Sequence, residues 1–132
     1  MAIEYSFAGS KDTLIVTASG CDENAREVQD YGMAVIAAAR ECGCQRVLCD
    51  ERDLVYQTSA LDAVQVLTAL AAGAPDIERV AFISSVEGAD DAFFHGIAAS
   101  NRGVEAQAFV DPEMARKWIA RPLSKVGSPY GR

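Results

Sequence analysis

The sequence places four consecutive charged residues, Asp50, Glu51, Arg52 and Asp53, at the end of an apolar run that predicts a buried central strand over residues 46–50. In open α/β sheets, ligands bind where such strands end. These side chains could hold a cationic or hydroxylated ligand, or form a charged contact surface. The alternative is a solvated loop in which Arg52 pairs loosely with a neighbouring acid, contributing at most about 1 kcal/mol. The pattern favours this alternative, because charged loops are common on protein surfaces.

A second candidate site lies a few residues further on, at the hydroxyl side chains of Thr58 and Ser59. Either residue is a suitable N-cap for the helix that apolar spacing predicts over residues 59–72, and Ser59 with Asp62 approximates a capping box. A helix N-terminus stabilises negative charge, so a phosphate on such a hydroxyl would be tolerated there. Thr58 and Ser59 are therefore candidates for interaction or phosphorylation.

The one histidine of the chain, His95, has the side chain best suited to act as a general base near neutral pH. No nucleophile lies near it in the sequence. Its position in a predicted helix among Phe93, Phe94 and Ile97, which we expect to be buried, indicates a partly exposed structural histidine. An enzyme that uses His95 together with Asp50 is therefore the least favoured class of function, and we predict that the protein is not an enzyme.

The cysteines do not form a recognisable metal or redox motif. There are four, and Cys42-Gly43-Cys44 has the spacing C-x-C rather than the C-x-x-C of redox and zinc sites. A single histidine cannot complete a typical ligand set, and Cys49 lies in the apolar run as a small core residue. We expect all four cysteines to remain reduced and no metal or other cofactor to be bound.

Length and composition are those of one soluble globular domain. The chain has 132 residues, half of them hydrophobic, and a net charge of −7, which argues against general binding to nucleic acid or to anionic membranes. The first residues lack the features of a signal peptide, and no apolar stretch approaches the roughly 18 residues of a membrane span. We therefore expect a cytoplasmic protein without membrane insertion.

Hydrophobic periodicity predicts the elements that must position these residues. The expected strands cover residues 3–8, 13–19, 46–50, 80–84 and 105–109, and the expected helices cover 22–41, 59–72, 90–100 and 111–120. The order β-β-α-β-α-β-α-β-α predicts an α/β fold with a mixed, mostly parallel five-stranded sheet and helices packed on it. We expect residues 1–120 to form the domain and residues 121–132 to form a basic, mobile tail.

Apolar spacing also predicts which helical side chains are buried. In the second helix these are Leu61, Val64, Leu67, Leu70 and Ala71. In the last helix they are Ala115, Trp118 and Ile119. Gly103 is expected to close the third helix in a left-handed conformation.

The element order and two passages resemble a known family. One passage runs from the strand Val47-Leu48-Cys49-Asp50 to Ser59-Ala60-Leu61, and the other comprises Asn101-Arg102-Gly103-Val104, Phe109 and Ala115-Arg116-Lys117-Trp118-Ile119. Over residues 3–119 the chain resembles the STAS domain, the fold of bacterial anti-sigma-factor antagonists, and also the related sheet of the lipid-binding CRAL-TRIO proteins.

In antagonists of that family, a serine at the start of the helix after the central strand is phosphorylated by a partner kinase. The resemblance makes Ser59 the nearest equivalent, with Thr58 beside it, although the usual aspartate-serine-glycine run is absent and the connection from Asp53 to Ser59 is longer.

The resemblance implies a non-enzymatic protein-interaction module of bacterial signalling, with a kinase or an anti-sigma-like protein as partner. Its recognition surface would be the stretch from Asp50 to Ser59 and the second helix. The alternative is a binder of a small apolar ligand or lipid through a CRAL-TRIO-like internal cavity. A homodimer through an exposed sheet edge or an alanine-rich helix is compatible with either function.

Overall fold

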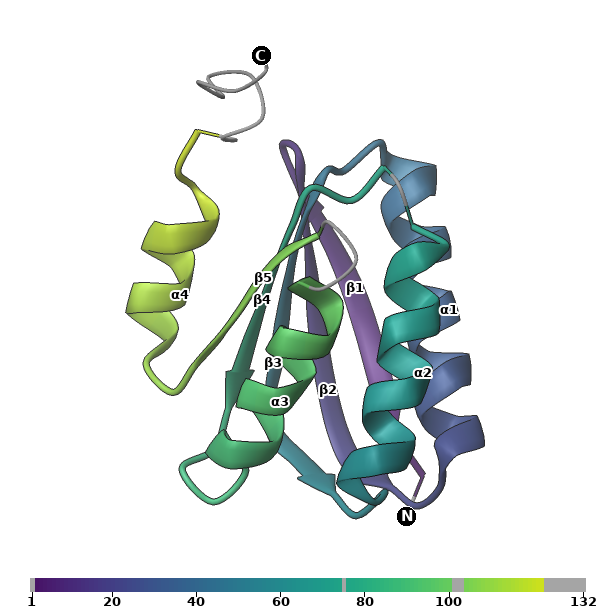
Figure 1. Cartoon of the computed structure of the whole chain (residues 1–132). Coiled ribbons are helices and arrows are strands. Elements are labelled where there is room, and N and C mark those ends of the chain that lie inside the picture. Colours follow the sequence, from purple (N-terminus) through teal and green to yellow (C-terminus); the bar gives the residue numbers. More distant parts are fainter. Residues whose placement is uncertain (1, 75, 101–103, 123–132) are drawn as a thin grey trace.

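The computed structural model describes residues 2–74, 76–100 and 104–122. Within them, the strands are β1 (Glu4–Ser10), β2 (Thr13–Asp22), β3 (Arg46–Tyr56), β4 (Arg79–Ser84) and β5 (Glu105–Phe109). The helices are α1 (Ala25–Cys42), α2 (Ala60–Ala72), α3 (Ala89–Ser100) and α4 (Pro112–Ile119). The predicted element order is confirmed (Figure 1).

The strands form one mixed sheet in the order β1-β2-β3-β4-β5, in which β1 and β2 pair antiparallel and all other neighbours pair parallel. Helices α1, α2 and α3 lie on one face of the sheet, and α4 lies on the other (Figure 1). The core therefore has two parts. The larger part lies under α1, α2 and α3, and the smaller one, under α4, includes Leu48, Ile83 and Trp118. This arrangement confirms the predicted fold class.

The central strand β3 is longer than predicted. It continues to Tyr56 because β2 pairs with it along its whole length. The four charged residues thus lie inside a strand, and the prediction that they form a loop at its end is wrong. One residue of β2, Ala18, lies opposite two residues of β3, Glu51 and Arg52. This bulge shifts the alternation of side chains by one position, so Glu51 and Leu54 both face the helices α1–α3.

Helix α3 is rotated relative to the prediction. Phe93, Phe94 and Ile97, expected in the core, are exposed, whereas the inward face consists of small residues and a histidine. The inward residues are Ala92, His95, Gly96, Ala98 and Ala99. Small side chains let α3 approach β5 closely, and this close packing outweighs the burial of the larger apolar side chains.

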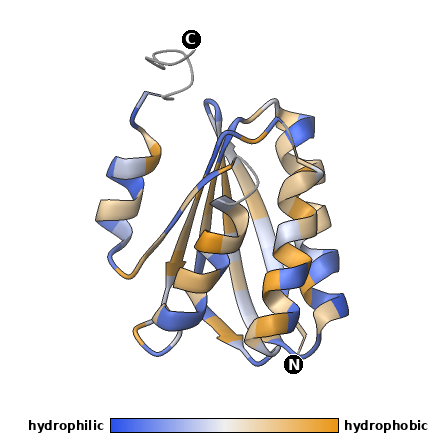
Figure 2. Ribbon diagram, in the orientation of Figure 1, coloured by the Kyte–Doolittle hydropathy of each residue, from blue (hydrophilic) through white to orange (hydrophobic). Residues whose placement is uncertain are grey.

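Helix α2 also departs from the predicted burial. Leu61 is 68% exposed and Ala63 is the buried residue of the helix, while Val64, Leu67, Leu70 and Ala71 are half-buried. Figure 2 colours most of α2 and α3 as hydrophobic, whereas the first turn of α3, which contains Asp90 and Asp91, is hydrophilic. Gly103 lies outside the described residues, so the predicted end of α3 is untested.

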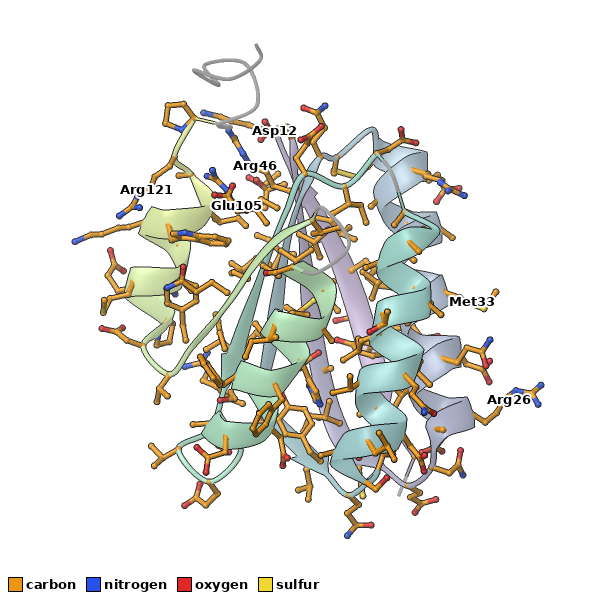
Figure 3. All side chains as sticks on the ribbon, in the orientation of Figure 1. Asp12, Arg26, Met33, Arg46, Glu105 and Arg121 are labelled. Atoms are coloured by element: carbon orange, nitrogen blue, oxygen red, sulfur yellow. A yellow bond between two sulfur atoms is a disulfide. The ribbon has the colours of Figure 1, made fainter. Side chains whose placement is uncertain are left out.

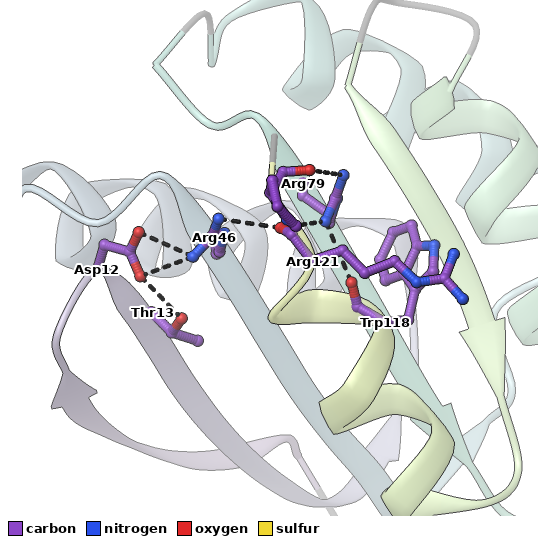
Figure 4. Close-up of polar contacts among 7 residues, drawn as sticks. Asp12, Thr13, Arg46, Arg79, Trp118 and Arg121 are labelled. Carbon is purple, nitrogen blue, oxygen red and sulfur yellow. Dashed lines mark hydrogen bonds and ion pairs between the residues drawn. The ribbon is translucent and has the colours of Figure 1, made fainter. Parts of the chain in front are cut away.

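Helix α4 docks through Ala115, Trp118 and Ile119, as predicted. Its C-terminal end is held by the buried side chain of Arg79, which is 3% exposed. The guanidinium donates to Glu105 Oε1 at 2.8 Å and lies 5.0 Å from the centre of the Trp118 ring. It also donates to the backbone carbonyls of Trp118 (3.1 Å) and Arg121 (2.8 Å), as Figure 4 shows, and to that of Pro122 (3.2 Å). The contacts with Trp118, Arg121 and Pro122 tie the chain after β5 to β4, and the contact with Glu105 joins β5 itself to β4.

Arg46 makes a second connection at the same end of the sheet. It forms a bidentate pair with Asp12, at 2.9 and 3.1 Å, and donates to the carbonyl of Arg121 at 3.0 Å. Asp12, Arg46, Glu105 and Arg121 are seen together in Figure 3, whereas Arg26 and Met33 point outward from α1. Arg121 and Pro122, which were predicted to start the tail, are thus bound to the sheet, and residues 123–132 lie outside the described part of the chain.

The cysteine prediction is wrong for one pair, because Cys42 and Cys44 form a disulfide. Helix α1 ends at Cys42, and Gly43 follows in a left-handed conformation with φ of 71°. This turn leaves the two Cα atoms 5.4 Å apart, within the range that a disulfide spans. Cys21 and Cys49 are free.

Candidate functional site

The charged residues of β3 are divided between the two faces of the sheet. Asp50 and Arg52 lie in the groove under α4 and form a bidentate pair, with Nε–Oδ1 at 2.9 Å and Nη2–Oδ2 at 2.7 Å. The hydrogen bonds from Arg52 hold the pKa of Asp50 below its ordinary value. Since the Arg52 side chain is half exposed, solvent screens the pair and it contributes little to stability. Asp53 is exposed.

Glu51 is the exception among these four residues, because its side chain faces the interior and is 3% exposed. Each carboxylate oxygen accepts one hydrogen bond, Oε2 from the hydroxyl of Tyr31 (2.8 Å) and Oε1 from the hydroxyl of Tyr56 (2.7 Å). Burial raises the pKa of Glu51 to about 7, although the two hydrogen bonds act in the opposite direction. Burial also raises the pKa of both tyrosines, and the charge of Glu51 raises it further.

A cavity of about 100 Å³ lies between the sheet and helices α1, α2 and α3. Its apolar lining includes Val28, Val35, Leu67, Leu70, Val47 and Phe82. Its polar lining consists of Asp22, Tyr31, Cys49, Glu51, Tyr56 and His95. Helices α1 and α2 meet closely over it, since a Cβ added at Gly32 would lie 2.3 Å from Leu70 Cδ1. The predicted rim residue Glu51 is therefore part of an internal, largely apolar site.

His95 reaches this cavity from α3. It is 8% exposed, and its ring meets the ring of Tyr56 edge-on, with centroids 4.9 Å apart. The prediction of a partly exposed histidine is thus wrong. Burial lowers the pKa of His95 to about 4, against the opposing charge of Asp91, so the imidazole is neutral at pH 7. Asp50 lies on the opposite face of the sheet, so the His95–Asp50 pair of the enzyme hypothesis is not assembled.

The connection from β3 to α2 is held by Asp22, at the end of β2. Its buried carboxylate accepts hydrogen bonds from the backbone N–H groups of Gln57 and Thr58, the latter at 2.9 Å, and its carbonyl accepts from the Thr58 hydroxyl at 3.0 Å. Burial raises the pKa of Asp22, while the two backbone hydrogen bonds lower it. The sequence pattern places Asp22 at a helix start, but Asn24 is the N-cap of α1. Asp22 instead fixes the segment that presents Ser59.

Of the two predicted candidates for the N-cap of α2, Ser59 is the cap, and its Oγ accepts a hydrogen bond from the N–H of Asp62 at 3.2 Å. Ser59 is exposed, whereas Thr58 is half-buried and bonded to Asp22. Of the two hydroxyls proposed as interaction or phosphorylation sites, the one on Ser59 is the more accessible. Its phosphorylation stays a prediction.

Large apolar side chains are exposed on the two helices beyond Ser59. They are Leu61 on α2 and Phe93, Phe94 and Ile97 on α3, and we call them the α2–α3 surface. The two helices are in contact along the same face of the sheet (Figure 1). Phe93 and Phe94 also contact each other, with ring centroids 6.0 Å apart. Large apolar side chains exposed on two neighbouring helices are typical of a contact surface.

In residues 2–74, 76–100 and 104–122, no three His, Cys, Asp or Glu side chains gather so that they could hold a metal ion. None of the helices in these ranges combines the length and apolar character needed to cross a membrane.

Sequence reasoning missed the contributions of Tyr31, Tyr56 and Asp22. Tyr31 lies on the buried face of α1, and only a polar partner inside the core distinguishes its hydroxyl from those of other buried tyrosines. Glu51 is that polar partner, but the predicted strand ends at residue 50, whereas β3 continues to Tyr56. An acid at an inward position of an apolar strand requires hydrogen-bond donors from neighbouring elements.

The chain has the fold of the SpoIIAA-like proteins. An uncharacterised protein of the DUF3478 family with a SpoIIAA-like fold, from Shewanella loihica, matches with a TM-score of 0.55 and 21% identity over 90% of this chain and 94% of that chain. An anti-sigma factor antagonist from Mycobacterium paratuberculosis matches with a TM-score of 0.61 and 8% identity, over 91% and 96%.

The anti-sigma factor antagonist SpoIIAA, in its unphosphorylated form, matches with a TM-score of 0.53 and 8% identity, over 86% and 94%. No protein-family model and no curated protein matches the sequence. At these identities the likeness defines the fold, which is that of STAS-type antagonists. The predicted relation to CRAL-TRIO proteins stays a prediction.

Proposed function

We propose that the protein is a non-enzymatic interaction module of bacterial regulation, and that phosphorylation of Ser59 controls its binding to a protein partner. The observation that carries this proposal is the position of Ser59, exposed at the N-cap of the helix that follows the central strand. Anti-sigma factor antagonists share the fold, and one of them is described in an unphosphorylated form. The partner class is a kinase or an anti-sigma-like protein, in the cytoplasm.

The surface around Ser59 supports such a role. The α2–α3 surface supplies an apolar centre, and Asp62, Asp90 and Asp91 supply an acidic margin in the first turns of the same helices. Protein interfaces of the non-obligate kind combine an apolar core with a polar rim. We expect the partner to bring apolar side chains to the centre and basic side chains to the margin.

Phosphorylation of Ser59 would change this surface in a defined way. A phosphate adds about −1.5 to −2 charges at pH 7 and is stabilised at a helix N-terminus, so α2 would stay intact. The added charge lies next to Asp62, and its desolvation opposes contact with an apolar partner surface. The modified protein should therefore release its partner.

Affinity capture from a bacterial lysate tests the proposal, with wild type, Ser59→Asp and Ser10→Asp as baits. Ser10 is also an exposed serine, at the end of β1, and serves as the matched control. We expect wild type and Ser10→Asp to retain the same partner and Ser59→Asp to lose it. If all three proteins capture the partner equally, Ser59 does not regulate its binding.

A second candidate function is the binding of a small apolar ligand, and the largely apolar lining of the cavity of about 100 Å³ favours it. The test is titration with toluene, followed by the amide chemical shifts of α1, α2 and α3. Saturable shifts confined to residues that line the cavity support ligand binding, and their absence contradicts it.

Two further expectations stay proposals. A homodimer would use the edge strand β1, all of whose residues are exposed, including Tyr5 and Phe7. The second expectation is that residues 1–120 form a single domain. We extend this domain to Pro122, because Arg46 and Arg79 donate hydrogen bonds to the carbonyls of Arg121 and Pro122.

A further inference from the structure

We propose that the cavity binds a small amphiphilic amine, whose apolar body is about the size of a benzene ring and whose ammonium group donates to the carboxylate of Glu51. This inference rests on the second proposed function and adds the chemistry of the ligand.

The size of the cavity limits the ligand. At about 100 Å³ it is somewhat smaller than an apolar cavity of about 150 Å³ that binds benzene in an engineered protein. One ring or a short chain fits this space, whereas a lipid with two acyl chains does not. The lining from α1, α2 and β4 at Val35, Leu67, Leu70 and Phe82 suits an apolar body.

The charges of the cavity favour a cation. Among the described residues, the lining contains the carboxylates of Asp22 and Glu51 but no lysine or arginine. His95 supplies no positive charge at neutral pH, because burial holds its pKa at about 4. A buried carboxylate is costly unless it is paired and hydrogen-bonded. Glu51 has hydrogen bonds from Tyr31 and Tyr56 but no cationic partner in the part of the chain that the structure describes.

The geometry at Glu51 leaves room for a further donor. Each carboxylate oxygen accepts a single tyrosine hydroxyl and retains acceptor capacity, since an ionised carboxylate has about four lone-pair sites. The two tyrosines come from α1 and from the far end of β3, so they hold the carboxylate in place before the ligand arrives. An ammonium group also interacts favourably with aromatic rings, of which Tyr31, Tyr56 and Phe82 line the cavity.

Binding of the amine should depend on pH, because Glu51 must be ionised. The titratable groups that line the cavity are Asp22 from β2, Tyr31 from α1, Cys49, Glu51 and Tyr56 from β3, and His95 from α3. Burial raises the pKa of both tyrosines and of Cys49 above ordinary values that already lie at 9 or higher, so these groups stay neutral near pH 7. Glu51, with a pKa of about 7, changes charge between pH 6 and 8, so the affinity for the amine should rise about tenfold over this range.

The test is isothermal titration of the full chain with benzylamine, benzyl alcohol and toluene at pH 6 and pH 8. The proteins are wild type, Glu51→Gln and Asp53→Asn, the last as a control with an exposed acid on the same strand. At pH 8 we expect Glu51→Gln to weaken benzylamine binding about tenfold or more, the loss of one charge-assisted hydrogen bond. Toluene binding should change less than about twofold, and Asp53→Asn should behave as wild type.

Three results overturn the proposal, and they are distinguishable. If toluene binds while benzylamine binds no more tightly and ignores Glu51→Gln, the ligand is apolar and the second proposed function survives alone. If benzyl alcohol matches benzylamine at both pH values, the head group is neutral. If no probe binds, the amine proposal and the ligand-binding function fail together. If Glu51→Gln does not fold, wild type alone tests the proposal. Its affinity for benzylamine should rise between pH 6 and pH 8 while its affinity for toluene stays the same, and equal behaviour of the two probes contradicts the proposal.

Discussion

The hydroxyl of Tyr31 lies 2.8 Å from Oε2 of Glu51, which joins the middle of α1 to the middle of the central strand. Tyr56 donates to the other oxygen from the end of β3. These two hydrogen bonds stabilise a carboxyl group in an apolar interior, where an unsatisfied one would be costly. Glu51 is therefore the polar centre of the core under α1, α2 and α3.

The raised pKa of Glu51 predicts a specific pH dependence of stability. The folded protein binds this proton more tightly than the unfolded chain, because the pKa rises from 4.5 to about 7. The contribution is therefore fully present below about pH 4.5 and is lost as the pH rises through 7. One pKa unit corresponds to about 1.4 kcal/mol. As the pH rises through this range, the free energy of unfolding of Glu51→Gln should therefore increase by on the order of 3 kcal/mol relative to that of wild type.

Urea unfolding of wild type, Glu51→Gln and Asp53→Asn at pH 4.5, 6 and 8 measures this difference. Asp53 is exposed on the same strand, so its variant should follow wild type. A difference between Glu51→Gln and wild type that stays constant with pH contradicts the assignment.

His95 should change the free energy of unfolding with pH in the opposite direction to Glu51. Its pKa falls from 6.5 to about 4 on burial, so its contribution to stability is present above pH 6.5 and is lost as the pH falls through 4. A His95→Gln variant should lose less stability on acidification than wild type, by on the order of 3 kcal/mol between pH 6.5 and pH 4. The measurement is urea unfolding over this range. If the free energies of unfolding of the two proteins change with pH in parallel, His95 is not buried in its neutral form.

Arg79 should be among the residues whose loss costs most stability. Arg79→Met removes the donors to Glu105, Trp118 and the residues after α4, and we expect a loss of about 3–5 kcal/mol in the free energy of unfolding. Arg26→Met is the matched control, because Arg26 lies exposed on α1 in an (i, i+4) pair with Asp30 (Figure 3). That control should change by less than about 0.5 kcal/mol. Equal losses in the two variants are incompatible with the role of Arg79.

The cap at Ser59 can be tested apart from any regulation. Ser59→Ala removes the acceptor for the N–H of Asp62 and should cost about 1 kcal/mol, while Ser59→Asp keeps an acceptor and should leave stability nearly unchanged. Denaturant unfolding of the two variants provides the comparison. If Ser59→Ala is as stable as wild type, the hydrogen bond seen at α2 does not stabilise the helix.

The element order could be predicted because each element carries its own local signals. Turn residues separate β1 from β2, Ser59 and Asp111 cap helices at the expected positions, and the apolar runs of β3 and β4 have the length of buried strands. These signals depend on neighbouring residues in the sequence. They are sufficient to define the fold class.

Apart from Ser59, the candidate site could not be predicted, because it depends on contacts between distant elements. Pairing with β2 keeps Asp50–Asp53 in a strand, and a bulge opposite Ala18 sets which of these residues faces inward. The phase of α3 is set by close packing of small residues on β5, which exposes Phe93 and Phe94 and buries His95. The disulfide likewise depends on the left-handed turn at Gly43.

In the proposed function, Ser59 controls the binding of a protein partner. The most direct measurement is the affinity of the captured partner for the full chain, prepared with phosphoserine at position 59 and without it, by isothermal titration. We predict that the phosphate weakens binding by about tenfold or more, which corresponds to about 1.4 kcal/mol. Equal affinities for the two forms would contradict the claim.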